Sequence, residues 1–169
     1  LIKGARNNNV TVGSKGNLNA SMAIEMEHIL EKPRGEVDRS MGDIHPAGNP
    51  HYLLNPNNAI LVAELIANRL GELDIENKAL YEQNYIDYKI KVETLLTKLK
   101  PKISGLSGQD IVCYHVHWSY LLEWLNINIA GLIELRPGIP PTPKHNEHII
   151  DLMEDKQIKV VFISSWKEP

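Results

Sequence analysis

Residues 110–135 read DIVCYHVHWSYLLEWLNINIAGLIEL, and this stretch decides the fold class. Asp110–Tyr114 and Ile127–Leu135 are short apolar runs, which are typical of buried strands. Residues 118–125 between them predict a short helix. Two strands joined through a helix by short connections favour a right-handed crossover and a parallel sheet. The stretch therefore predicts an α/β fold.

The same alternation continues toward the end of the chain. Residues 137–141 form a proline-rich rigid loop, and Thr142-Pro143 then predicts a capped helix that runs to about Glu154. Residues 159–164 predict a third strand. Together with the two strands before them, these residues extend the predicted parallel sheet.

Two helices are predicted before this α/β region. Residues 57–72 carry apolar side chains three and four positions apart, which indicates one apolar helix face. Asp74 is the predicted N-cap of a longer helix over residues 75–99, about 37 Å long, which Pro101 ends. A helix of that length can join two lobes as a spine; a plain surface helix or a coiled-coil arm is the alternative. Its predicted apolar stripe consists of Leu80, Tyr81, Tyr85, Tyr88, Val92, Leu95, Leu96 and Leu99.

The first 58 residues show little periodicity. A short helical segment is predicted near Met22–Ile29. Residues 31–50 predict a long loop punctuated by glycine and proline, and an irregular run of that length in a compact domain is either functional or mobile.

Bulk composition excludes several classes of protein. The 169 residues carry a formal net charge of -3, so no basic surface indicates a nucleic acid partner. The single cysteine, Cys113, excludes an internal disulfide and is expected to be a small buried hydrophobe. No apolar run approaches the length of a membrane span. The chain begins at Leu1 without a basic and apolar leader, so we expect a processed or truncated product.

Three side chains are candidate metal ligands. His115 and Glu134 each follow a predicted strand, and ligands of open parallel sheets bind at the carboxyl ends of strands. His51 lies in a loop between Pro50 and Pro56 that leads into a helix. Neutral imidazole nitrogens and a carboxylate suit zinc, manganese or iron(II).

Each candidate has a plainer alternative. His51 can cap the following helix or simply pack. If the His115-Val116-His117 segment is extended, both rings lie on one face. If the segment forms a helical turn, the rings diverge. Only one ring could then bind an ion, and His117 would be a surface group. Glu134 can form an ion pair with Arg136.

The remaining histidines and motifs give no site. His145 and His148 share a predicted helix face, which we expect to be solvated, and nothing near His28 supports a role. No HExxH motif, phosphate-binding glycine loop or nucleophile elbow is present.

Residues 48–59, GNPHYLLNPNNA, resemble a signature of the periplasmic metal-binding solute-binding proteins of ABC importers, of the zinc and manganese type. Residues 4–7, 38–46, 114–120 and 133–141 also look like this family, in the same order. Leu53 and Asn55 replace a frequent Trp and a frequent Asp, and residues 163–166 depart from the usual pattern.

The resemblance implies a two-lobed α/β fold with a long spine helix, of which only part of each lobe is present. Residues 1–73 would belong to the N-terminal lobe, 74–100 to the spine and 101–169 to the C-terminal lobe. It implies that His51 and His115 bind zinc or manganese in the cleft between lobes. The two further ligands of the family lie outside this chain, so His45, His117 or Glu134 would have to complete a site here.

The implied function is extracytoplasmic capture of the metal ion, in the periplasm or at the cell surface, for delivery to the membrane permease of an ABC importer, without catalysis. Peripheral membrane association would use a lipid anchor that this chain does not contain. Lobe strands missing from the chain would expose apolar surface, so we expect disorder before residue 57 or self-association. The alternatives are a zinc-dependent hydrolase using His115, His117 and Glu134, and a surface adhesin.

Overall fold

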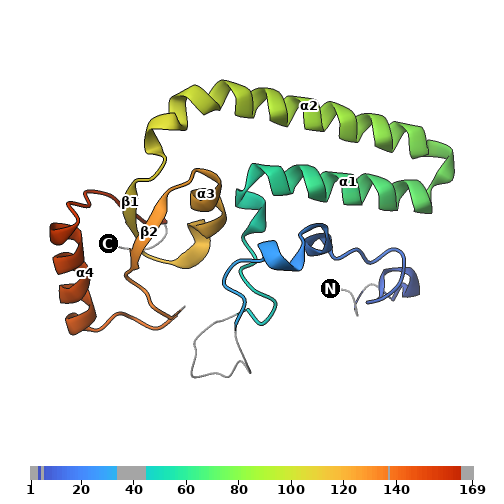
Figure 1. Ribbon diagram of the computed structural model, residues 1–169. Coiled ribbons are helices and arrows are strands. Elements are labelled where there is room, and N and C mark those ends of the chain that lie inside the picture. Colours follow the sequence, from blue (N-terminus) through green and yellow to red (C-terminus); the bar gives the residue numbers. More distant parts are fainter. Residues whose placement is uncertain (1–3, 5, 34–44, 137, 165–169) are drawn as a thin grey trace. The chain divides into compact units, whose positions relative to one another are not determined.

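The computed structural model describes residues 4, 6–33, 45–136 and 138–164, which form two compact units (Figure 1). One unit combines Leu1–Met26 with Pro56–Lys100, and the other combines Glu27–Asn55 with Pro101–Pro169. Residues 38–44 of the resemblance motif, Ala5, Pro137 and residues 165–166 lie outside the described residues, as does much of the predicted 31–50 loop. The assignment of residues to lobes stays a prediction.

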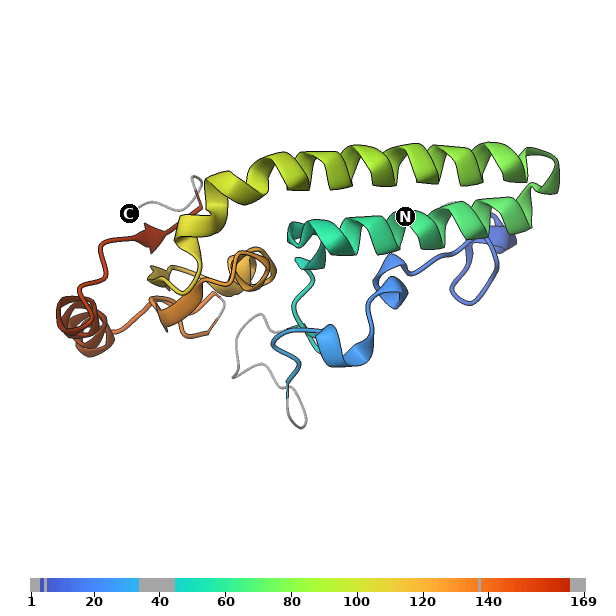
Figure 2. The ribbon, with the colours of Figure 1, turned by 45° about the horizontal axis from the view of Figure 1, so that its top comes forward.

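The first unit is built on a hairpin of two helices, α1 (Pro56–Leu73) and α2 (Lys78–Ile103). They run alongside each other in opposite directions (Figures 1 and 2). The turn between them contains the 3₁₀ helix Ile75–Asn77, which the Asp74 side chain caps by accepting a hydrogen bond from the Asn77 N–H. Tyr81 Oη donates to the same carboxylate at 2.9 Å. The helix over 57–72 is therefore confirmed, whereas Asp74 caps a 3₁₀ turn that leads into the long helix, which begins at Lys78 and not at residue 75.

Two expectations for the long helix are wrong. The helix passes through Pro101 and ends at Ile103, because a proline so close to the end removes only one backbone hydrogen bond from the last turn. Only half of the predicted apolar stripe is covered: Tyr81, Tyr85, Val92 and Leu96 are half-buried. The other members are 40–58% exposed, namely Leu80, Tyr88, Leu95 and Leu99.

Short 3₁₀ helices fill the irregular N-terminal region. They comprise Asn8–Val10, Ala20–Ala23, Met26–His28 and Tyr52–Leu54. The single helical segment predicted near Met22–Ile29 is therefore two separate turns. Ala20–Ala23 packs against α1, and Arg69 of α1 donates to the Lys15 carbonyl at 2.9 Å.

The second unit contains a three-stranded sheet of β1 (Asp110–Cys113), β2 (Asn128–Leu132) and β3 (Val161–Phe162). The order is β2-β1-β3, and both pairings are parallel, as predicted. The crossover helices are α3 (Ser119–Trp124) and α4 (Pro143–Asp155), the latter capped by Thr142 as expected. Two 3₁₀ turns, Ser104–Leu106 and Val116–Trp118, flank β1.

Alternate residues of β1 enter two separate cores. Ile111 and Cys113 pack with Leu122 of α3, whereas Val112 packs with Ile149 of α4. The sheet therefore lies between two helical layers, which explains why β1 is apolar on both faces. Gly131 leaves room for α4 to pack on the sheet, since a Cβ there would lie 2.9 Å from Ile149 Cδ1 and would make this side chain shift.

Cys113 is fully buried, as predicted, and burial raises the pKa of its thiol to about 11. A thiol with so high a pKa stays protonated and is a poor metal ligand at neutral pH. Among the described residues, no helix is both long and apolar enough to cross a membrane.

Candidate metal site

The parallel pairing of β1 with β2 brings His115 and Glu134 together. Just beyond the strands, the Glu134 N–H donates to the Tyr114 carbonyl at 2.8 Å. Glu134 is only 4% exposed, and its Oε2 lies 3.3 Å from His115 Nε2. Its Oε1 accepts a hydrogen bond from the Gly138 N–H at 3.1 Å. The prediction that His115 and Glu134 meet at the ends of parallel strands is therefore confirmed. An additional ion pair between Glu134 and Arg136 stays a prediction.

The ring of His117 lies beside that of His115. The chain is extended at His115 and then enters the 3₁₀ turn Val116–Trp118. The expectation that a helical turn would make the rings diverge is wrong, because their centroids are 4.0 Å apart, with planes tilted by 41°. The turn begins only after His115, so the two side chains stay adjacent.

His51 completes a row of three imidazoles. Its ring centroid lies 4.8 Å from that of His117, which is therefore the middle ring. His51 occupies the N-cap position of the Tyr52–Leu54 turn, but its side chain makes no capping hydrogen bond. The alternative that this imidazole caps a helix is therefore wrong, and the ring packs against another histidine.

Two anchors hold the His51 loop in the second unit. Asn49, which is 7% exposed, donates from its amide to the Val116 carbonyl at 2.8 Å. The Leu30 carbonyl accepts a hydrogen bond from the Asn49 N–H. The Leu30 N–H in turn donates to Tyr120 Oη at 3.0 Å. Tyr120 belongs to α3 and is 1% exposed, so the loop is attached to a buried residue of the core.

Gly48 permits the close approach of these loop segments. Its φ is +100°, a conformation that favours glycine, and a Cβ there would lie 2.4 Å from Ile29 Cγ2. The glycine of the GNPHY sequence is therefore required by the backbone that presents His51.

Electrostatics favour the neutral form of His51. Burial lowers the pKa of its imidazole below the usual 6.5, and the neighbouring His117 and His45 lower it further, while Glu31 opposes the shift. His45 is exposed but close enough to contribute this repulsion. A neutral imidazole keeps a lone pair available for a metal ion at neutral pH.

The row of rings needs adjustment to chelate an ion. In the described part of the chain, no three of His51, His115, His117 and Glu134 bring ligand atoms within 4.8 Å of one another. Rotation of at least one ring would therefore accompany binding. The roles of these four residues and of His45 as metal ligands stay predictions.

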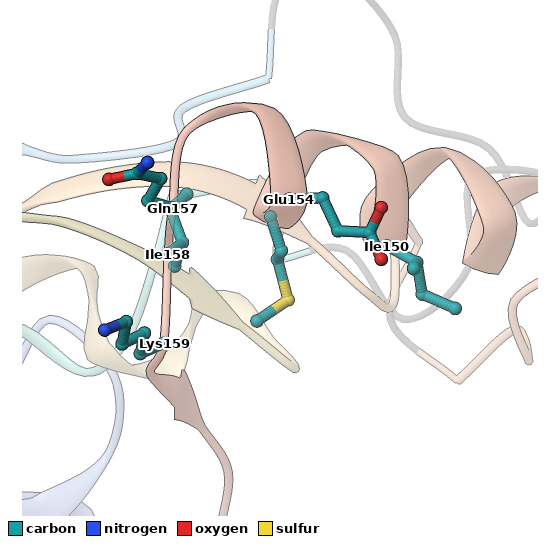
Figure 3. A pocket seen from close by; sticks show the side chains of 6 residues that line it. Ile150, Glu154, Gln157, Ile158 and Lys159 are labelled. Atoms are coloured by element: carbon teal, nitrogen blue, oxygen red, sulfur yellow. The ribbon is translucent and has the colours of Figure 1, made fainter.

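The other histidines lie apart from this row. His145 Nε2 is 2.8 Å from the Leu132 carbonyl, which ties α4 to β2, so the expectation of a wholly solvated face is wrong for this residue. His148 is exposed, and His28 lies 4.0 Å from the exposed Glu27. A shallow hollow at the end of α4 contains none of the candidate ligands; Ile150, Met153, Glu154, Gln157, Ile158 and Lys159 line it (Figure 3).

Sequence reasoning assigned no role to three residues that shape the site: Asn49, Glu31 and Tyr120. Asn49 and Tyr120 stand inside the motifs that carry the family resemblance, which was the available signal. No sequence signal indicated a role for Glu31, because its hydrogen bond with Asn49 joins positions that the long loop separates.

Comparisons with known proteins extend these observations. The metal ABC transporter substrate-binding lipoprotein ScbA of Streptococcus cristatus is 29% identical over 119 residues, covering 69% of this chain and 38% of that protein. The high-affinity zinc uptake system protein ZnuA of Brucella abortus is 27% identical over 119 residues, covering 70% of this chain and 36% of that protein. The chain thus spans less than two fifths of these relatives.

A solved structure gives the same result for the fold. A Zn(II)-bound mutant variant of the AdcAII protein of Streptococcus pneumoniae matches with a TM-score of 0.59 and 25% identity, covering 88% of this chain and 57% of that chain. The match confirms the predicted α/β fold of metal-binding solute-binding proteins, present here in part. The model of the family described as zinc-uptake complex component A, periplasmic, matches residues 3–169, and the chain therefore belongs to that family.

Proposed function

We propose that the protein containing this chain captures a divalent transition-metal ion outside the cytoplasm and delivers it to the membrane permease of an ABC importer. The observation that carries the proposal is the row of three imidazoles, His51, His117 and His115, with centroid separations of 4.8 and 4.0 Å. After rotation of at least one ring, neutral imidazoles grouped in this way would provide nitrogen donors for one ion. Protonated rings would repel one another, so the cluster favours a bound cation over bound protons.

The donor set favours zinc. Imidazole nitrogen suits zinc better than manganese, which prefers carboxylate and water oxygens and binds more weakly to a given set of donors. Glu134, whose Oε2 lies 3.3 Å from His115 Nε2, would act mainly as a neighbouring carboxylate that orients this ring and increases its basicity. The names of the zinc uptake protein of Brucella abortus and of the Zn(II)-bound AdcAII variant support the same ion.

Transport requires capture followed by release, and catalysis is not needed. The curated relatives are named as substrate-binding or uptake-system proteins, which supports this role over the hydrolase alternative. The lipoprotein relative supports a location at the cell surface or in the periplasm. Further ligands from the remainder of the protein would complete the coordination.

The test is a competitive zinc titration at pH 7.5 of the chain and of the variants His51→Ala and His115→Ala. Each variant should bind zinc more weakly, because each lacks one imidazole. The matched control is His148→Ala, which removes an exposed histidine from α4. Zinc affinity equal to that of the control would refute the proposal, and turnover of ester or phosphate substrates by the zinc-bound chain would favour a hydrolase.

A further inference from the structure

We infer that Asn49 is a positioning residue that fastens the His51 loop to the peptide between His115 and His117. The inference rests on the proposed metal-binding function and adds a residue to it. Asn49 itself donates no atom to the ion. Its role is to keep the imidazoles of two distant chain segments together before the ion arrives.

Every hydrogen-bonding group of the Asn49 side chain is used. The amide Nδ2 donates to the Val116 carbonyl and to Glu31 Oε2, both at 2.8 Å. The carbonyl Oδ1 accepts from the His51 N–H at 2.9 Å. An asparagine amide has two N–H donors and one carbonyl, and here each has a partner. The side chain is therefore fixed in one orientation.

The partners of this amide explain its effect on the site. Val116 stands between His115 and His117 in the chain, and its carbonyl also accepts from Ser119 Oγ at 2.9 Å. Asn49 is two residues before His51 and holds that residue's own N–H. One side chain thus connects the backbones that carry all three imidazoles. Fixing them in advance lowers the conformational entropy lost when the ion binds.

The second contact, to Glu31, provides a way to separate two roles. The Asn49–Glu31 bond closes the base of the 31–49 loop, whereas the Asn49–Val116 bond joins that loop to the His115 segment. Aspartate at position 49 keeps the size and the acceptor of asparagine but loses both donors. Adding Glu31→Gln supplies a donor that can restore the bond between positions 31 and 49, but not the bond to Val116.

The experiment compares the full chain with Glu31→Gln, with Asn49→Asp and with the double variant that combines the two substitutions. In the metal-free state, NMR should detect contacts between the ring protons of His51 and His117 in the parent and in Glu31→Gln. Both variants that carry the Asn49→Asp substitution should lose these contacts. Zinc affinity at pH 7.5 should fall about 10–100-fold in the same two variants, the usual effect of losing a supporting hydrogen bond around a metal site.

The outcomes distinguish the inference from the function it rests on. Recovery of ring contacts and affinity in the double variant would show that loop closure alone matters and would overturn the inference. Unchanged zinc binding in Asn49→Asp would overturn it as well. Failure of the parent chain to bind zinc would refute the proposed function, while loss of the ring contacts in metal-free Asn49→Asp would still support the positioning role. Ring NMR shifts on zinc addition should report His51 as the one imidazole that stops responding in Asn49→Asp.

Discussion

The position of His117 between two other imidazoles makes its removal the sharpest perturbation of the proposed site. Replacing it with alanine removes one nitrogen donor and also leaves a space between His51 and His115. Replacing it with phenylalanine removes the nitrogen but retains an aromatic ring. The pair of variants therefore separates ligation from packing.

The expected loss follows from the number of donors. Structural zinc sites with four ligands bind with about 10–16 kcal/mol, or roughly 2.5–4 kcal/mol for each ligand, which corresponds to a loss of about 10²–10³ in affinity. We expect His117→Phe and His117→Ala to lose affinity by similar factors in this range. A ring that only supported its neighbours would be replaced well by phenylalanine, and affinity would then recover in that variant.

The assay must avoid competition by protons. Removing His117 removes one of the neighbours that lower the pKa of His51, so that pKa should rise toward 6.5. Competitive titration at pH 7.5 keeps His51 neutral in both proteins and measures the donor effect alone. The same titration near pH 6 should show an additional loss in the variants. Zinc binding by His117→Phe as tight as that of His148→Ala would refute ligation by His117.

Three further predictions concern the loop that carries His51. The pKa of His51 is lowered in the folded state, so the contribution of His51 to the stability of the metal-free chain should be present above pH 6.5 and lost as the pH falls through the lowered folded pKa. Urea unfolding between pH 7.5 and 5 measures this contribution. The variant His51→Ala should show a weaker dependence of stability on pH. Gly48→Ala should reduce the free energy of unfolding by about 1–3 kcal/mol, because of the positive φ and the close Ile29 methyl group. Gly105→Ala should have little effect, because a Cβ there would meet nothing within 4 Å. Thermal unfolding compares the two variants. Tyr120→Phe should lower the free energy of unfolding by about 1–3 kcal/mol, because it leaves the Leu30 N–H without its acceptor. Faster hydrogen exchange at the Leu30 amide would show this loss directly. Unchanged exchange would contradict the role of Tyr120 as an anchor.

Local patterns were sufficient to predict the helices and the parallel sheet. Periodic apolar residues predicted α1 to within one residue at each end, and the strand-helix-strand pattern predicted the crossover around α3. The errors concern the end of α2, the division of the Met22–Ile29 segment into two turns, and packing that no short window of sequence records. The stripe on α2 is only half covered, because burial depends on which neighbouring segment lies against each turn.

The site was predictable where a local rule applied. His115 and Glu134 follow from the general tendency of ligands to collect at the carboxyl ends of parallel strands. His51 was identified mainly through a resemblance, and its position depends on bonds between residues far apart in the sequence. Asn49 and Val116 are 67 positions apart, and Leu30 and Tyr120 are 90 positions apart. No periodicity links such pairs.

The number of donors in one unit has a consequence for how a transported ion would be held. His51, His115 and His117 all belong to the unit that contains the sheet, so their mutual geometry depends on its core and on the Asn49 contact. As ligands, three imidazoles would satisfy three positions of a tetrahedral zinc ion and would leave the fourth for another ligand or for water. An ion held in this way has a position open to exchange, which is useful for cargo that must be released. We therefore expect ligands outside this chain to strengthen binding to a partly assembled site, so that this chain alone should bind zinc measurably but more weakly than the intact protein.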